Sequence, residues 1–196
     1  MKVELNRNIA TPYLNLMRSI AMTQIPCIRP IAFSVGNSNL VTAGNTVMED
    51  MIEFNNNLSS LKYRGNLSKD LEVVSLICNG VLKSSDLEKK GLSVCSDSDS
   101  ELLHVLNNEI QVTVYFYCGT NTMNTQETKH TLEANSIGVN NNIIPMNANF
   151  SCIKKFAYSL VSTKAGKEEY EVTIETDNGM SEEEVWSFCK NFVTEC

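Results

Sequence analysis

The sequence has little of what catalytic, metal-binding and membrane-spanning proteins require. It contains only two histidines, and it lacks the common nucleotide-binding, serine-hydrolase and zinc-protease motifs. No apolar run reaches the roughly 18 residues of a transmembrane helix, and the N-terminal residues do not follow the pattern of a signal peptide. We therefore expect a cytoplasmic protein with no catalytic residue, metal site or cofactor of its own and with no membrane partner.

The cysteines lack the spacing of a metal site or a disulfide framework. There are seven of them, an odd number, and no two form a C-x-x-C pair. In a chain without a secretory signal, such cysteines are usually buried, reduced thiols. We expect neither disulfides nor a zinc site.

Positive charge is also scarce. The chain has 16 lysines and arginines against 23 aspartates and glutamates, which gives a formal net charge of −7. Binding to nucleic acid depends on basic side chains that neutralise phosphates. We therefore expect no direct DNA binding, although an acidic chain can belong to an assembly in which other subunits hold the nucleic acid.

The remaining candidates for chemistry have simple interpretations. His104 and His130 are flanked by nothing that resembles a catalytic triad or a set of metal ligands. Asp97, Asp99 and Glu101 resemble a cation-binding loop, but the glycine and the final glutamate of an EF-hand are missing. The prediction for this run is a solvated acidic loop.

Apolar residues are concentrated in the first helix that the sequence predicts. Residues 2–5 alternate as a strand does and residues 6–8 favour a turn. Thr11 and Pro12 have the types expected at an N-cap and a first helical position, and Pro26 disfavours helix at the residue before it. The apolar side chains cover roughly 160° of this helix, more than the stripe that packing on one core needs.

The last predicted helix is equally wide. Strands at residues 153–161 and 170–174 precede it, and Ser181 with Glu184 forms a capping-box pattern at its start. Its apolar residues also cover roughly 160°. Two such helices fit either the centre of a monomer core or an interface between two copies, and the pattern leaves both open.

Between these helices the pattern indicates one more helix and a β-rich region. Helical spacing begins at Val47 and leads through Leu58 to Leu61, with Glu49 and Asp50 in the expected first turn. Strand-like runs at residues 28–35, 71–78 and 111–118 are separated by polar connections. The sequence therefore predicts an α+β fold, in which residues 1–62 and 151–196 form one discontinuous domain and residues 63–150 form an inserted β-rich subdomain.

Four segments resemble, in the same order, the α subunit of bacterial RNA polymerase. Residues 14–20, followed by Ile25 and Pro26, resemble the dimerisation helix of that family, whose pattern is Gly-Asn-Ala-Leu-Arg-Arg-Ile-Leu. Residues 47–61, 151–158 and 172–184 resemble its later motifs, with Cys152 in place of a family proline. The resemblance spans nearly the whole chain and implies an α-like assembly subunit of a multisubunit DNA-dependent RNA polymerase.

The same resemblance implies partners and contact residues. The chain is expected to pair with a second α-like subunit, as a homodimer or heterodimer, and to scaffold β-like and β′-like subunits that hold the catalytic metals. The implied dimer interface comprises Tyr13, Leu16, Met17, Ile20, Val185, Trp186, Phe188 and Phe192. The implied large-subunit contacts are Asn15, Arg18, Glu49, Asp50, Asn57, Lys154 and Lys155. The second arginine of the family's first helix is Ser19 here.

The end of the chain and its composition give further expectations. The chain ends at Cys196, so we expect the DNA-binding C-terminal domain of bacterial α subunits to be absent. Asparagine runs at residues 55–57 and 140–142 are typical of AT-rich coding sequences, as in phages and organelles, whose compartments are host cytoplasm, stroma or matrix. The rival interpretation is a standalone α+β homodimeric binding protein, and a third is an enzyme with an unrecognised site in the inserted subdomain.

Overall fold

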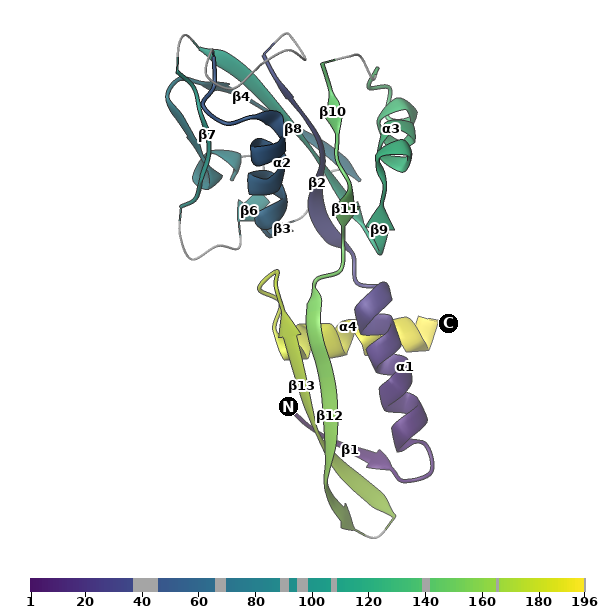
Figure 1. Ribbon diagram of the computed structural model, residues 1–196. Helices are drawn as coiled ribbons and strands as arrows, with labels where there is room; N and C mark the ends of the chain where they lie inside the picture. The colour runs from purple at the N-terminus through teal and green to yellow at the C-terminus, as the bar shows by residue number, and fades with distance from the viewer. Residues whose placement is uncertain are drawn as a thin grey trace. The chain divides into compact units, whose positions relative to one another are not determined.

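The computed structural model describes residues 1–36, 46–65, 70–88, 92–94, 99–106, 109–138, 142–164 and 166–195 (Figure 1). The chain forms two compact units: unit 1 consists of Met1–Pro26 and Ser151–Cys196, and unit 2 consists of Cys27–Phe150. Helices and antiparallel strands occur in both units, so the predicted α+β fold is confirmed. Each unit is described by itself below.

Unit 1 is an antiparallel sheet with helices packed on it. The strand order is β1 (Lys2–Asn6), β13 (Lys167–Thr176), β12 (Ile153–Lys164), and the helices in its described residues are α1 (Ala10–Thr23) and α4 (Glu182–Glu195). In β13, Tyr170, Val172 and Ile174 are buried, whereas the residues between them are exposed. This alternation, which the sequence predicts, is that of a sheet with one covered face.

The start of α1 differs from the prediction. Thr11 is not the N-cap, because Ile9 occupies that position and makes no side-chain capping bond. The preceding turn explains the earlier start: the Asn8 N–H donates to the Asn6 side chain, and the Ile9 N–H donates to the Asn6 carbonyl. Pro12 still lies in the first turn, where a missing N–H leaves no intrahelical bond unmade.

The start of α4 follows the predicted capping box. The Ser181 N–H donates to the Glu184 carboxylate at 2.8 Å, and the Glu184 N–H donates to the Ser181 hydroxyl at 3.2 Å. Glu182, the first helical residue, accepts the N–H of Ile174 at 3.0 Å and pairs with the amino group of Met1 at 3.0 Å. One carboxylate therefore joins α4 to β13 and to the residue before β1.

Unit 2 is built on a six-stranded sheet. The sheet runs in the order β4 (Leu71–Cys78), β8 (Ile110–Gly119), β2 (Cys27–Val35), β3 (Tyr63–Gly65), β6 (Leu92–Val94), and β10 (Ile144–Pro145) also pairs with β2. Small antiparallel pairs accompany it: β5 (Val81–Lys83) with β7 (Glu101–His104), and β9 (Thr122–Met123) with β11 (Ala148–Asn149). The helices among the described residues are α2 (Met51–Ser60), α3 (Thr125–Ala134) and the short 3-10 helix η1 (Ser84–Leu87).

Aromatic side chains dominate the core of unit 2. Phe33 of β2 packs edge-on against Phe54 of α2, with ring centroids 5.0 Å apart. Tyr63 of β3 packs in a similar way on Phe116 of β8 at 4.9 Å, and burial raises the pKa of its phenol. Such pairs contribute about 0.5–1.5 kcal/mol each beyond the area they bury. α2 is therefore held on the sheet by the apolar side that carries Phe54 and Leu58.

The boundary between the units differs from the one that the sequence predicts. Residues 27–62 belong to unit 2 and not to the unit of the first and last helices. The reason is strand pairing, because β2 lies between β8 and β3, and eight of its nine residues are buried. A strand covered on both faces has a continuous apolar run, so its pattern identifies the strand but not the sheet that it joins.

The start of α2 is also later than predicted. The helix begins after Asp50, whose carboxylate accepts the N–H groups of Ile52 and Glu53, both at 2.7 Å. Val47, the expected first helical residue, forms a β-bridge with Val105 instead. Glu49 therefore lies outside the helix.

α3 occupies a stretch whose beginning the sequence pattern assigns to a polar loop. Asn124 accepts the N–H groups of Gln126 and Glu127, and the Glu127 carboxylate accepts the N–H of Asn124 at 2.7 Å. Thr128 and Leu132, one helical turn apart, are buried. Figure 1 shows the helix beside β10. Its apolar stripe is narrow, which is why helical periodicity did not reveal it.

The helices and cysteines of the described residues can be characterised further. None of their helices is long and apolar enough to span a membrane. The cysteines among them, Cys27, Cys78, Cys118, Cys152 and Cys189, are thiols and not disulfide-bonded. Burial raises the pKa of the Cys189 thiol to about 11, so this thiol is uncharged at neutral pH.

Candidate functional site

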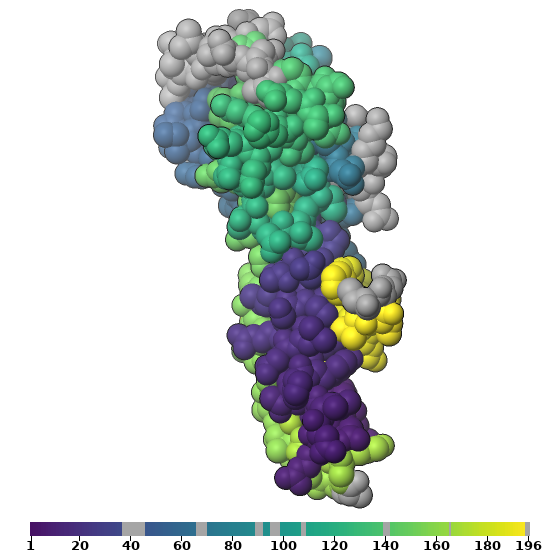
Figure 2. Space-filling model, turned by 90° about the vertical axis from the view of Figure 1, so that its right-hand side faces the viewer, coloured from purple at the N-terminus to yellow at the C-terminus, as the bar shows by residue number. Residues whose placement is uncertain are grey.

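The helices α1 and α4 of unit 1 pack against each other. Their contact includes Tyr13 and Trp186, whose rings meet edge to face with centroids 6.3 Å apart. Burial raises the pKa of the Tyr13 phenol, and the neighbouring Cys189 adds to the effect. Figure 2 shows the two helices side by side, α1 in purple and α4 in yellow. The two helices with the wide apolar arcs therefore pack against each other within unit 1.

Half of the residues expected at a dimer interface are buried within unit 1. Met17, Ile20, Val185 and Trp186 are between 0% and 6% exposed. Side chains buried to this extent fill the core of their own unit. For these four residues, the wide apolar arcs are accounted for by packing inside one chain.

The other four expected interface residues keep apolar surface. Leu16 is 47% exposed, and Tyr13, Phe188 and Phe192 are half-buried. Ile9, just before α1, is 57% exposed. Because Ile9, Tyr13 and Leu16 are spaced four and three residues apart, they fall on one stripe of the helix. The uncovered part of the expected interface thus has two components. One is this apolar stripe on α1, and the other is the stacked ring pair of Phe188 and Phe192 on α4.

The expected large-subunit contacts in unit 1 are all exposed, but they differ in their internal partners. Asn15 accepts a hydrogen bond from the Tyr158 hydroxyl at 2.8 Å, which joins α1 to β12. Lys155 lies 3.2 Å from the carboxylate of Glu175. Arg18 and Lys154 make no hydrogen bond or ion pair with any residue in the described ranges. Of this group, Arg18 and Lys154 are the charges that the described part of the unit does not use.

The expected large-subunit contacts in unit 2 all have roles inside that unit. Asp50 caps α2, as described above. Asn57 donates from its side-chain amide to the carbonyl of Leu102 at 3.1 Å, which fixes α2 to β7. Glu49 accepts the backbone N–H of His104 at 2.6 Å and also binds the ring Nδ1 of the same histidine. These three polar side chains are therefore occupied by local structure.

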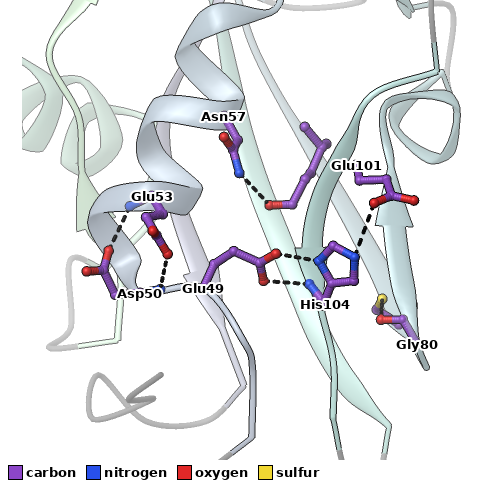
Figure 3. Close-up of polar contacts among 9 residues, drawn as sticks. Glu49, Asp50, Glu53, Asn57, Gly80, Glu101 and His104 are labelled. Atoms are coloured by element: carbon purple, nitrogen blue, oxygen red, sulfur yellow. Dashed lines mark hydrogen bonds and ion pairs between the residues drawn. The ribbon is translucent and has the colours of Figure 1, made fainter. Parts of the chain in front are cut away.

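Glu49, His104 and Glu101 form a cluster between α2 and β7 (Figure 3). One oxygen of Glu49 faces the His104 backbone and the other faces its ring Nδ1. The second ring nitrogen, Nε2, lies 3.2 Å from the carboxylate of Glu101. The side chain of Glu49 is only 15% exposed, whereas that of Glu101 is 55% exposed. The imidazole is thus placed between one half-buried and one solvated carboxylate.

This arrangement favours the charged forms of His104 and Glu49. The hydrogen bond to Glu49 raises the pKa of His104 above its ordinary value, against the opposing effect of burial and with added help from Glu101. Burial acts to raise the pKa of Glu49, but the hydrogen bonds from the His104 N–H and ring outweigh it, so that pKa is lowered. Opposite shifts in two partners are those of an ion pair.

A pocket of about 510 Å³ lies beside this cluster. It is lined by Met48, Glu49, Glu53, Asn56, Asn57 and His104. Met48 at its wall and Ile52 on α2 are 63% and 70% exposed. Among the described residues, no group of three or more histidine, cysteine, aspartate or glutamate side chains is arranged to hold a metal ion. The lining of the pocket mixes polar and apolar surface; it carries two carboxylates and one imidazole, and the exposed side chain of Met48 belongs to it.

The sequence analysis missed the pairing of Glu49 with His104. The two residues are 55 positions apart, and no local pattern links them. A partial signal was present in Asp50 and Glu53, because Asp-x-x-Glu is a capping-box pattern. Taken as the start of α2, this pattern leaves Glu49 in an extended segment, free to contact another strand.

Neither a scan against protein-family models nor a search of curated proteins finds a match for this chain.

Proposed function

We propose that this protein is an α-like assembly subunit of a multisubunit DNA-dependent RNA polymerase. It pairs with a second α-like subunit and scaffolds the β-like and β′-like catalytic subunits. It supplies no catalytic residue to the reaction; phosphoryl transfer takes place in the large subunits. The basis is the ordered resemblance of four segments to that family together with one structural feature of unit 1.

The feature that carries this proposal is the apolar surface left on the α1–α4 pair. These are the two helices that the family uses for dimerisation, and in unit 1 they pack on each other through Tyr13 and Trp186. Leu16 remains 47% exposed in spite of that contact. Exposed apolar side chains gathered on one face support an interface with another protein. A second copy or a related α-like chain covers this face in the proposal.

The large-subunit surface in the proposal is centred on Arg18 in unit 1. Arg18 is exposed on α1, and its side chain has no ion-pair partner within the described ranges. An arginine suits such a contact because its planar group makes paired hydrogen bonds with carboxylates. In unit 2, the exposed Met48 and Ile52 offer a separate apolar contact beside an acidic pocket. Glu49, Asp50 and Asn57 support that surface by shaping it.

Co-purification tests this proposal. We expect an affinity-tagged chain, expressed in the cells that naturally make it, to bring down two large subunits. The eluate should synthesise RNA from nucleoside triphosphates on a DNA template, and its native mass should correspond to two α-like chains with the large subunits. The isolated chain should show no polymerase activity.

The same experiment separates the proposal from its rival. A tagged chain that elutes only as a homodimer, without large subunits or RNA synthesis, would support a standalone α+β binding protein. Leu16→Glu provides a control, because it should reduce recovery of the large subunits if their assembly requires the dimer.

A further inference from the structure

The segment before α2 is attached to the end of β7 by several backbone contacts. The Met48 N–H donates to the His104 carbonyl at 2.8 Å, and the Leu106 N–H donates to the Thr46 carbonyl at 2.9 Å. The bridge between Val47 and Val105 lies between these bonds. Residues 46–48 therefore act as a short extra strand beside β7, and Glu49 is the next residue along the chain.

The side chain of Glu49 adds hydrogen bonds to this contact, and these depend on whether the His104 ring is protonated. One of its oxygens accepts the His104 backbone N–H, and the other binds ring Nδ1, while Glu101 faces ring Nε2 at 3.2 Å. A protonated imidazole donates hydrogen bonds from both nitrogens, but a neutral imidazole donates from only one. Only the charged ring can therefore satisfy both carboxylates at the same time.

We propose that Glu49, His104 and Glu101 form a proton-dependent clasp, which fastens the start of α2 to β7 when the imidazole is charged and loosens it when the imidazole is neutral. The clasp also controls one wall of the pocket beside α2, because Met48, Glu49 and His104 line it. This inference concerns the local structure of unit 2 and does not depend on the proposed role in transcription.

The charged groups around His104 are mostly acidic. The segment before α2 supplies Glu49 and Asp50, α2 supplies Glu53, and β7 supplies Glu101. On the neighbouring strand β5, the ammonium group of Lys83 is directed to Asp99, at 3.6 Å. The last residue of β4, Cys78, adds a thiol that donates to the Gly80 carbonyl; burial raises the pKa of this thiol. Negative charge on these acidic groups favours the protonated form of the ring.

The two carboxylates respond differently when the ring loses its proton. A neutral ring that keeps its proton on Nδ1 turns a lone pair towards Glu101, and one that keeps it on Nε2 turns a lone pair towards Glu49. Glu101 can move into solvent because its side chain is 55% exposed. Glu49 is 15% exposed and has no such escape. Deprotonation therefore releases Glu101 and, in either tautomer, removes the ring charge that strengthens the bond to Glu49, which weakens the hold on the start of α2.

Hydrogen exchange of the whole chain tests the clasp. We expect the protection of residues 46–60, corrected for the intrinsic exchange rate, to fall about two- to fivefold as the pH rises from about 6 to about 8.5. His104→Gln should abolish this pH dependence. His130→Gln is the matched control, because His130 is the other histidine of the chain and its side chain is 82% exposed. A variant at His130 should behave like the unaltered protein.

Glu101→Gln provides a second test that does not remove the histidine. The amide of glutamine can donate to a neutral Nε2, so this variant should keep residues 46–60 protected at high pH. An equal fall in Glu101→Gln and the unaltered protein would overturn the proposal. So would a pH profile that persists in His104→Gln, or an NMR titration in which the pKa of His104 is not raised above its ordinary value of 6.5.

Discussion

At the scale of single residues, Glu49 and Glu182 use the same device in different units. Each accepts a backbone N–H from a strand, Glu49 from His104 at 2.6 Å and Glu182 from Ile174 at 3.0 Å. Each also faces a group that is positively charged when it is protonated, the His104 ring or the amino group of Met1. Hydrogen bonds to an ionised carboxylate are about twice as strong as neutral ones. Both carboxylates therefore stabilise their units most when they are charged.

Replacing Glu182 should remove part of the acid sensitivity of unit 1. The Ile174 N–H, and then the Met1 amino group, lower the pKa of Glu182 below its ordinary value of 4.5. A lowered pKa gives stability that is present above pH 4.5 and is lost as the pH falls through the lowered value. In urea unfolding, Glu182→Gln should be less stable than the unaltered protein at neutral pH and equally stable in acid. Glu183→Gln, at the next exposed position, should be as stable as the unaltered protein at every pH. If Glu182→Gln instead lost the same amount of stability at every pH, the effect would not come from the charge of Glu182.

Arg18 should matter for binding to large subunits and not for folding. Its side chain is exposed, so Arg18→Ala should change the free energy of unfolding by less than about 0.5 kcal/mol. At a buried interface, losing a charged hydrogen bond typically costs about 2–5 kcal/mol of binding free energy. Quantitative pull-down of the large subunits measures this difference, with Lys129→Ala on α3 as a control for loss of one exposed charge. Unchanged binding by Arg18→Ala would mean that this arginine is simply solvated.

At the scale of elements, long apolar strands were predictable and helix starts were less so. The runs at residues 28–35, 71–78 and 111–118 became β2, β4 and β8 with ends that differ by at most one residue. Each run is rich in β-branched, aromatic or other apolar residues, which favour a strand without help from the rest of the chain. Helix starts depend on which side chain caps the first turn. Thr11 has the right residue type for a cap but the Asn6 turn precedes it, and α2 and α3 start at Asx-x-x-Glu boxes that the helical spacing did not reveal.

The candidate sites were also predictable only in part. The apolar stripe with Leu16 follows from helical spacing, because residues three and four apart share a face. The burial of Met17, Ile20, Val185 and Trp186 does not follow from it, since spacing alone cannot tell which part of a wide arc the chain's own core will cover. The Glu49–His104 pair was beyond sequence pattern for another reason. It depends on a bridge between Val47 and Val105, which only the folded chain brings together.

The contribution of the N-cap of α3, Asn124, to stability can be measured by itself. Asn124 accepts the N–H groups of Gln126 and Glu127 at 2.9 and 3.0 Å. Replacing an asparagine cap with alanine typically costs about 1 kcal/mol, so Asn124→Ala should lower the free energy of unfolding by about that amount. Gln126→Ala, an exposed change two residues along in the first turn, should cost only a few tenths of a kcal/mol by the same measurement, because its backbone N–H still donates to Asn124. Equal effects of the two variants would mean that helix propensity, and not the cap, limits α3.

At the scale of the whole molecule, the uncovered stripe of unit 1 predicts self-association. Stable dimers bury on the order of 2,000 Å², and a charge at the centre of such an interface is costly. Leu16→Glu and Phe188→Glu should therefore shift the protein to monomer or aggregate in sedimentation measurements at micromolar concentration. Ser19→Glu, on the polar side of α1, should leave the association unchanged. A monodisperse monomer from the unaltered chain would rule out this use of the stripe.

Unit 1 is built from two segments that lie far apart in the sequence, and this has a consequence during synthesis. A ribosome adds about 5–20 residues per second, so translation of residues 27–150 takes on the order of 10 s. Throughout that interval the nascent α1 has none of residues 151–195 to cover Leu14 and Met17, whereas all of unit 2 emerges as one continuous piece. We expect ribosome-bound chains that stop before Ser151 to crosslink to a chaperone from position 17, and chains extended past the end of α4 to lose that crosslink. Crosslinking that does not change with chain length would show that α1 is sheltered by other means until its partner strands are made.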